Sequence, residues 1–345
     1  MALIIVGGGV SPPETITLAG MADLKGCDKI LIDVYTTQWN TDALRRTCGI
    51  FPAAVKSDRT MLEDVEGIIR ESSASSVGIL TCGDPFIATT HQSLRDACIR
   101  SGVKVVVHYS SSFLNVLLGE LGLHIYKIGF VGTVMKSPPD ALYPIYAGVK
   151  GAYLAGKHSI LLMGSDGNGD RSITPNMAID ILMGLDVPSG ERMFTPDLPA
   201  IVSSRMGRPT QEIWVDTLSK LSGLEFGEPP YSMVIPARLH FTELDILKRV
   251  CNVNQVVGEL MGREIRSTAH IRAEATIAKT KSALLHARAN AGAGLTSLLE
   301  NVGLYLDDAE TFLNQGKDEL ALVESSYAEG LLDALRFQNV MDIKW

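Results

Sequence analysis

The sequence predicts an α/β protein with two lobes, the first on a parallel sheet and the second on a mixed sheet, followed by an all-α helical bundle. Three observations predict this. Short β-branched runs alternate with amphipathic stretches over the first hundred residues, strand-like runs continue to about Ile235, and none follows Cys251. A chain of 345 residues is also longer than the ~100–200 residues of an ordinary domain, so we expect domains at 1–109, 110–252 and 255–345.

The first lobe is predicted from short buried strands and the helices between them. The strands are rich in Val and Ile and too short for helices; they are Leu3–Val6, Lys29–Val34, Val77–Thr81 and Val103–His108. Apolar residues at helical spacing predict helices at Pro13–Leu24, Arg59–Arg70 and Thr90–Arg100. This strand and helix order is typical of a mostly parallel sheet covered by helices.

The second lobe begins after a short segment near Tyr109–Ser112, which we expect to form a hinge and a cleft. Its predicted helices are Phe113–Leu121, Ala141–Ala155 and Asn176–Leu185. Its predicted strands are Ile125–Phe130, His158–Met163, Ala200–Ser204 and Ser232–Ile235. A hairpin over Ile201–Val215 makes this sheet mixed.

The last part of the chain is predicted to be a separate helical bundle. Its helices are Glu264–Asn290, Leu295–Ala309 and Glu319–Phe337. Two helical faces are expected to pack together; they are Leu295, Leu298, Leu299, Val302 and Leu306 on one helix, and Leu320, Val323, Tyr327, Leu331 and Ala334 on the other. From Gln255 onward the chain has 9 Lys or Arg and 13 Asp or Glu, a net charge of −4, so it is not a basic arm.

Composition and charge exclude several classes of protein. The chain has 31 Lys and Arg against 39 Asp and Glu, a net charge of −8, so it lacks the basic footprint of a nucleic-acid or anionic-membrane binder. The N-terminus has no secretory signal pattern, and no apolar run approaches the ~20 residues of a membrane span. Five scattered cysteines without a C-x-x-C pair argue against a disulfide framework and a zinc site. We therefore expect a cytoplasmic protein.

Three consecutive glycines, Gly7, Gly8 and Gly9, follow the first predicted strand. The dinucleotide fingerprint G-x-G-x-x-G requires glycine at its third position, where this sequence has Pro12. A phosphate-cradling P-loop requires a Lys followed by Ser or Thr, which the sequence lacks here. A nucleotide site is thus disfavoured, and a structural glycine turn is the alternative.

A second candidate loop, Gly83-Asp84-Pro85, follows a predicted strand and precedes a helix. Open α/β sheets bind ligands at the carboxyl ends of their strands. Asp84 supplies a carboxylate, and Thr89 or Thr90 is placed to cap the following helix. The alternative is an ordinary Asp-Pro turn capped by threonine.

Six segments in order over about residues 1–250 match the pattern of a known family; they are Val6–Val10, Glu14–Leu18, Gly83–His91, Gly122–Gly129, Phe226–Pro236 and Leu239–Phe241. In these segments the chain resembles the diphthine synthases, which belong to the tetrapyrrole methylase-like class of S-adenosylmethionine methyltransferases. The resemblance implies a two-lobed fold with S-adenosyl-L-methionine in the cleft, assembled as a homodimer. It also implies N-methylation of a 3-amino-3-carboxypropyl histidine on the translocation elongation factor, during diphthamide biosynthesis.

The resemblance also implies which positions contact the cofactor, largely through backbone groups. These positions are Val10, Asp84, Ile87, Ser112, Phe113, Met163, Met206 and Tyr231. Three positions depart from the family pattern: prolines replace an Asp at 12 or 13, Phe113 replaces Ile, and Tyr231 replaces His. The helical tail is absent from ordinary diphthine synthases and resembles a small archaeal helical domain of unknown function, so we expect an archaeal source.

The residue types fit methyl transfer from a sulfonium to an amine. This displacement requires no enzyme nucleophile or metal, and positioning of two reactants supplies up to ~7–11 kcal/mol. We assign no catalytic residue and no metal, and His91 is expected to cap or pack behind the Gly-Asp-Pro loop. Of Tyr126 and Lys127, one is expected to be core or surface; the alternative is that Lys127 attracts the carboxylate of the acceptor.

Two other functions are alternatives to this one. The first is a methyltransferase of the same class that acts on a tetrapyrrole or an RNA. A tetrapyrrole would favour a cleft lined with Arg or Lys, and RNA a basic face. The second is a non-catalytic scaffold that acts through its helical tail.

Overall fold

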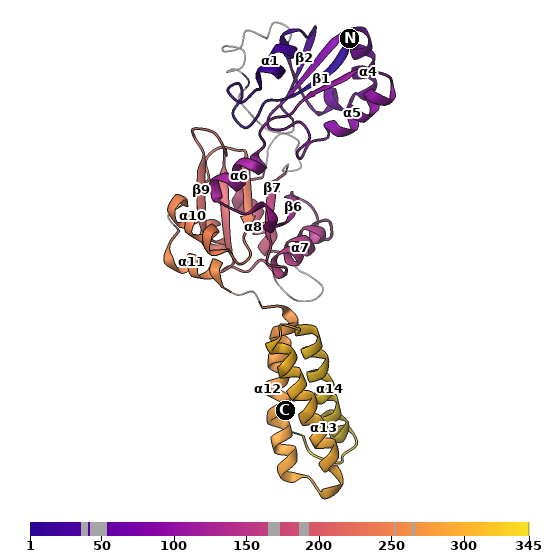
Figure 1. The fold of residues 1–345 in the computed structure, drawn as a ribbon, viewed down its shortest axis with the longest axis vertical. Coiled ribbons are helices and arrows are strands. Elements are labelled where there is room, and N and C mark those ends of the chain that lie inside the picture. Colours follow the sequence, from indigo (N-terminus) through magenta and orange to yellow (C-terminus); the bar gives the residue numbers. More distant parts are fainter. Residues whose placement is uncertain are drawn as a thin grey trace. The chain divides into compact units, whose positions relative to one another are not determined.

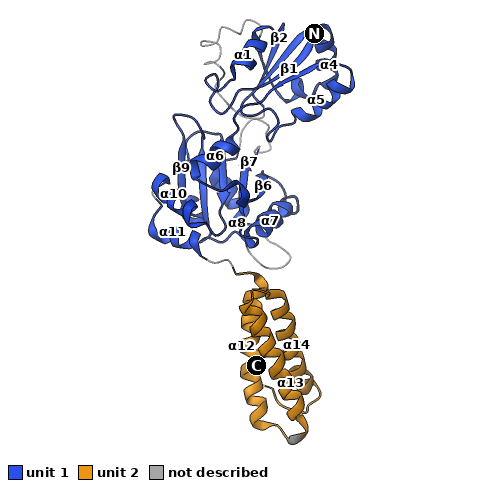
Figure 2. Cartoon of the chain, in the orientation of Figure 1, with its two compact units in different colours: residues 1–263 blue, residues 264–345 orange. Residues whose placement is uncertain are grey.

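The computed structural model describes residues 1–35, 41, 54–164, 173–185, 193–251, 253–263, 266–343 and 345. Cys48 and the Gly- and Asp-rich segment 165–170 lie outside the described residues. The chain forms two compact units, Met1–Arg263 and Glu264–Trp345 (Figure 2). Unit 1 holds both α/β lobes.

The first lobe is built on a five-stranded parallel sheet in the order β3-β2-β4-β1-β5. Its strands are β1 (Ala2–Gly7), β2 (Lys29–Asp33), β3 (Ala54–Ser57), β4 (Ser76–Thr81) and β5 (Val105–His108). Alternate residues of β1 point to opposite faces: Ile4 and Val6 belong to one core cluster, and Leu3 and Ile5 to another. The predicted parallel sheet is confirmed, and β3 is a strand that the sequence analysis did not predict.

The helices of this lobe are α1 (Leu18–Lys25), α3 (Arg59–Glu63), α4 (Val65–Ala74) and α5 (His91–Arg100). The helix expected from Pro13 begins only at Leu18, because the Thr17 side chain accepts a hydrogen bond from the Gly20 N–H and caps it there. The helix expected over Arg59–Arg70 is divided at Asp64, whose side chain caps the second half.

The second lobe contains a five-stranded mixed sheet in the order β6-β7-β10-β8-β9. Its strands are β6 (Ile128–Val134), β7 (His158–Met163), β8 (Pro199–Ser204), β9 (Glu212–Thr217) and β10 (Tyr231–Ile235). Strands β6 and β7 are parallel and the other pairs antiparallel, so the predicted mixed sheet is confirmed. In the predicted hairpin Ile201 lies opposite Val215. The strand expected from Ile125 starts at Ile128, because residues Ile125–Lys127 form a 3-10 turn, η2.

The helices of this lobe are α6 (Phe113–Leu121), α7 (Pro139–Leu154), α8 (Pro175–Met183), α9 (Leu218–Leu221), α10 (Phe241–Cys251) and α11 (Gln255–Gly262). Helix α11 falls in the range that we expected for the bundle. Its Val257 and Met261 are buried in one cluster with Leu117 and Leu247 of the second lobe. The boundary between the units therefore lies after Arg263.

Unit 2 consists of α12 (Thr268–Asn290), η3 (Ala293–Leu295), α13 (Thr296–Asn314) and α14 (Asp318–Phe337), packed side by side (Figure 1). On α13, Leu299, Val302 and Leu306 are buried as expected. The face expected on α14 is wrong: Leu320, Val323 and Tyr327 are 48%, 62% and 54% exposed. The buried face of α14 lies about one residue further along the helix and comprises Ala321, Ser325, Ala328, Leu332 and Leu335.

Small side chains account for this shift on α14. Ala and Ser let helices approach closely, and a one-residue offset turns a helix face by ~100°. No helix in the described part of the chain combines the length and apolar character that a membrane crossing requires.

Candidate functional site

The glycine run after β1 and the Gly-Asp-Pro loop after β4 are joined by their backbones. The Gly9 N–H donates to the Gly83 carbonyl (3.1 Å), and the Gly83 N–H donates to the Gly9 carbonyl (2.8 Å). Gly9 has φ +73° and Gly83 φ +81°, a region that favours glycine. A Cβ at Gly9 would lie 2.4 Å from Thr15. The glycine run therefore serves as a structural turn that holds the second loop.

Asp84 fixes the shape of the Gly-Asp-Pro loop. One carboxylate oxygen accepts from the Phe86 N–H (2.9 Å) and the other from the Ser110 N–H (3.3 Å). The first bond makes the turn that composition predicted, and the second ties the loop to the segment between the lobes. Thr90 precedes α5 but makes no capping hydrogen bond with its side chain, while the Thr89 hydroxyl donates to the Pro85 carbonyl.

His91 lies buried behind this loop, as predicted. Its Nδ1 is 3.2 Å from the Pro85 carbonyl, and its Nε2 is 3.4 Å from Asp33 Oδ2. The same Asp33 oxygen accepts from the Thr81 hydroxyl at 3.1 Å. Asp33 was not among our candidates; the signal for it was an acidic residue that closes the buried run Ile30–Ile32.

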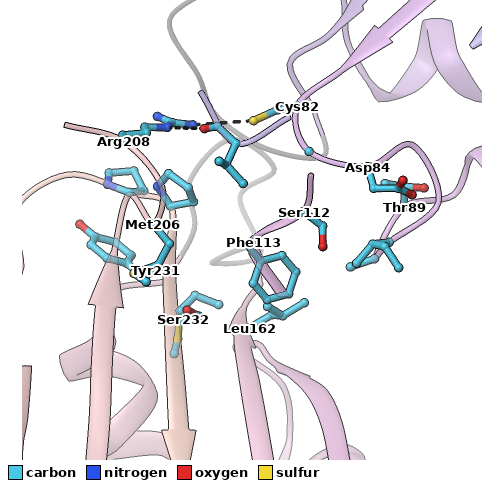
Figure 3. Close-up of a pocket in the computed structure, with 17 residues that line it drawn as sticks. Cys82, Asp84, Thr89, Ser112, Phe113, Leu162, Met206, Arg208, Tyr231 and Ser232 are labelled. Atoms are coloured by element: carbon cyan, nitrogen blue, oxygen red, sulfur yellow. Dashed lines mark hydrogen bonds between the residues drawn. The ribbon is translucent and has the colours of Figure 1, made fainter. Parts of the chain in front are cut away.

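One pocket in unit 1 lies beside these loops (Figure 3). It contains about 960 Å³ of empty space, a volume that includes open solvent. All eight positions that the resemblance implied line it: Val10, Asp84, Ile87, Ser112, Phe113, Met163, Met206 and Tyr231. The lining residues outside that set are Cys82, Gly83, Ala88, Thr89, Leu162, Arg208, Pro229, Pro230 and Ser232.

The turn between β8 and β9 approaches the first lobe closely at Val10. Gly207 has φ +77°, and a Cβ there would lie 2.4 Å from a methyl group of Val10. The next residue, Arg208, donates from Nε to the Val10 carbonyl at 3.0 Å. The two lobes therefore meet at this point, with the pocket beside the contact.

The Cys82 thiol and the Tyr231 hydroxyl line the pocket, and both have a raised pKa. Burial raises the pKa of the Cys82 thiol, although the nearby Arg208 guanidinium opposes this shift. Burial also raises the pKa of the Tyr231 hydroxyl, which donates a short hydrogen bond to the Gly227 carbonyl. Tyr231, which stands where the family pattern has His, therefore has its hydroxyl engaged within its own loop.

A buried carboxylate outside this pocket, Glu243, binds several residues of the other sequence motifs. Glu243 Oε1 accepts from the His124 N–H (2.8 Å) and lies 3.2 Å from His158 Nε2. Its Oε2 accepts from the His240 N–H (2.7 Å) and from Lys127 Nζ (2.9 Å). Burial alone would raise the pKa of Glu243, but these hydrogen bonds outweigh it and hold the pKa well below its usual range.

The alternative that Lys127 attracts the acceptor carboxylate is therefore wrong. Its ammonium group pairs with Glu243 and also donates to the Arg238 carbonyl at 2.6 Å. Within the described residues, no three His, Cys, Asp or Glu side chains come together as a metal site would require.

Residues 2–222 match the family model Tetrapyrrole (Corrin/Porphyrin) Methylases. The chain belongs to the tetrapyrrole methylase family. It is thus a methyltransferase, and this methylase carries an additional segment, residues 265–341, that matches a family model described as a protein of unknown function, DUF357.

Relatives of this methylase are named diphthine synthase or diphthine methyl ester synthase. A diphthine synthase of Staphylothermus marinus is 30% identical, over 73% of this chain and 94% of the relative. A diphthine synthase of Methanosphaera stadtmanae is 28% identical, over 73% and 97%. A diphthine methyl ester synthase of Eremothecium gossypii is 29% identical, over 71% and 88%. A crystal structure of diphthine synthase matches with a TM-score of 0.67 and 25% identity, over 75% of this chain and all of that one.

Proposed function

We propose that unit 1 is an S-adenosylmethionine-dependent methyltransferase that methylates the amino group of a 3-amino-3-carboxypropyl histidine on the translocation elongation factor, a step of diphthamide biosynthesis. The observation that supports this most is that eight positions, scattered from Val10 to Tyr231 in the sequence, line one pocket. The relatives that span this unit are named as diphthine synthases.

The lining residues fit S-adenosylmethionine. Apolar side chains of Phe113, Met163 and Met206 offer a surface for an adenosine group, and Asp84 and Ser112 offer polar groups near it. A Cβ added at Gly83 would meet no atom within 4 Å, so the loop leaves open space where a ligand would approach its backbone. When bound, the cofactor supplies an electrophilic methyl group.

The protein's own contribution to the reaction is to hold the two reactants in line and to exclude water. Positioning of this kind requires rigid walls, and the pairing of Gly9 with Gly83 and the two bonds of Asp84 make the wall of the first lobe rigid. The acceptor amine loses its proton to water, because Asp84, the one carboxylate among the described lining residues, already accepts two backbone hydrogen bonds.

A tetrapyrrole acceptor fits the pocket less well. Tetrapyrroles carry several carboxylates, and Arg208 is the one cationic side chain among the described lining residues. The fungal relative is named a diphthine methyl ester synthase, so the test below also distinguishes methylation of the amine from methylation of the carboxylate. The elongation factor as acceptor would place the reaction in the cytoplasm, and we propose a homodimer as the working form.

Mass spectrometry of the elongation factor tests the proposal. The chain is incubated with S-adenosylmethionine and an archaeal elongation factor that carries the 3-amino-3-carboxypropyl histidine. We expect stepwise gain of methyl mass on one histidine peptide, resistant to mild base because the product is an amine. The matched control is the same elongation factor with an unmodified histidine. Methyl transfer to a tetrapyrrole alone, or a product that base removes completely, would contradict the proposal.

A further inference from the structure

Arg208 is a cation in an acidic chain, and it stands at the wall of the pocket. It occupies the turn between β8 and β9 of the second lobe and lines the pocket together with Asp84 (Figure 3). No other Lys, Arg or His is among the described lining residues. Arg208 therefore supplies the only positively charged side chain among the described lining residues, and it would attract an anionic group of a ligand.

The hydrogen bonds of Arg208 leave part of its guanidinium available. Nε donates to the Val10 carbonyl at 3.0 Å, and Nη2 lies 3.7 Å from the Cys82 sulfur, a weak acceptor. A guanidinium has five N–H donors. Among the described residues the Arg208 guanidinium has no further hydrogen bond and no ion pair with a carboxylate. Its partly buried positive charge is therefore not balanced by a neighbouring carboxylate in this part of the chain.

The turn that holds Arg208 is fixed before any ligand binds. The Gly207 N–H donates to the Gln211 side-chain oxygen at 2.9 Å, and the Arg208 N–H donates to the Arg205 carbonyl at 3.1 Å. The Gln211 amide in turn donates to Glu120 on α6 at 2.7 Å. A donor group held on a rigid turn loses little freedom when it binds a ligand.

We propose that Arg208 is the carboxylate-binding residue of this pocket. The inference rests on the proposed function, in which the cofactor and the acceptor each carry a carboxylate next to an amino group. A planar guanidinium with unused N–H groups is suited to a carboxylate by charge and by shape. Figure 3 shows Arg208 in contact with Val10 and Cys82 at one end of the pocket and Asp84 apart from it, so a carboxylate at Arg208 would lie beside Cys82 rather than at Asp84.

Two compounds, the cofactor product S-adenosylhomocysteine and its truncated analogue 5′-methylthioadenosine, separate this role from a structural one. S-adenosylhomocysteine carries the carboxylate, and 5′-methylthioadenosine lacks the whole amino acid end. If Arg208 binds the cofactor carboxylate, Arg208→Gln lowers affinity for S-adenosylhomocysteine about tenfold to a hundredfold in calorimetric titration and leaves 5′-methylthioadenosine unchanged. Arg208→Lys keeps part of the affinity.

The second arm measures turnover on the elongation factor. If Arg208 binds the acceptor carboxylate instead, Arg208→Gln leaves both titrations unchanged and raises the KM for the modified elongation factor about tenfold or more. Arg205→Gln is the matched control. It removes the same charge from the same turn, but Arg205 is paired with Glu212 at 2.8 Å and does not line the pocket.

Two results would overturn the assignment. The first is an Arg208→Gln chain, folded by circular dichroism, with unchanged titrations and unchanged turnover. The second is equal loss of affinity for S-adenosylhomocysteine and 5′-methylthioadenosine, which would mean that Arg208 acts only by holding Val10. A wild-type chain that binds S-adenosylhomocysteine but never methylates the elongation factor refutes the proposed function, while the titration arm still tests Arg208.

Discussion

The buried carboxylate of Glu243 makes a quantitative prediction about stability. Each of its two oxygens faces two donors, and in Glu243→Gln one oxygen becomes an NH2 group that cannot accept. Two hydrogen bonds to a charged group are then lost, at about 1.5–3 kcal/mol each. Removal of one partner from a buried ion pair costs about 3–5 kcal/mol by a separate argument. We therefore expect Glu243→Gln to lower the free energy of unfolding by about 3–5 kcal/mol.

Urea denaturation followed by circular dichroism measures this loss, and the thermal midpoint should fall by roughly 6–20 °C. Glu71→Gln is the control, because Glu71 is also paired with a lysine, Lys29 at 2.7 Å, but on the surface. Its expected cost is below about 1 kcal/mol. If Glu243→Gln and Glu71→Gln proved equally mild, the idea that Glu243 holds η2, β7 and α10 together would be refuted.

The same comparison has a predicted pH dependence. The pKa of Glu243 is lowered in the folded protein, so its ionised form contributes stability above its ordinary pKa of 4.5. That contribution is lost as pH falls from there toward the folded pKa. The stability gap between wild type and Glu243→Gln should therefore be full near pH 7 and should narrow below pH 4.5. A gap that widened in acid would contradict the sign of the shift.

Three further predictions concern the pocket and the helical unit. Gly207→Ala should abolish cofactor binding in calorimetric titration, because the new Cβ would lie 2.4 Å from Val10 at a φ of +77°. Wild-type affinity in this variant would show that the turn can shift to accommodate the methyl group. Asp84→Ala should weaken S-adenosylhomocysteine binding about tenfold or more with the chain still folded, and collapse of thermal stability at unchanged affinity would restore the plain turn interpretation. Truncation after Arg263 should leave a folded chain that binds cofactor. Truncation after Val253 should lower the free energy of unfolding by about 3–6 kcal/mol, because two buried side chains of α11 are removed. Equal stability of the two fragments would contradict this packing.

Much of the fold follows from patterns within single segments. The buried Val and Ile runs predicted β1, β2, β4 and β5, and a hairpin over Ile201–Val215 was expected, whose register the structure then supplied. Strand β3 was missed because it has only four residues, of which Val55 and Lys56 are exposed, so its pattern is not that of a buried strand. The buried face of α14 was missed because the prediction followed the large apolar side chains, whereas the face that packs against the other helices includes the small residues Ala321 and Ala328.

The candidate site was predictable where it depends on a local motif. The Gly-Asp-Pro loop is a local turn, and its position after a strand was visible in the sequence. Arg208 and Asp33 were not, because each acts over a long separation. Arg208 contacts Val10 across 198 residues of sequence, and Asp33 contacts Thr81 across 48. Only the folded arrangement brings these pairs together.

The reciprocal hydrogen bonds between Gly9 and Gly83 make the two sides of the pocket differ in how well they tolerate substitution. On the first lobe the glycine run beside the wall has no room for side chains, because a Cβ at Gly7 or Gly9 would collide with its neighbours. Substitution of these glycines would distort the loops before it altered ligand preference. The opposite wall is made of side chains such as Met206, Arg208 and Tyr231, which can change without disturbing a backbone pair. Any effort to redirect this enzyme toward a new acceptor should therefore begin with mutant libraries in the second lobe, with the glycine loops left as they are.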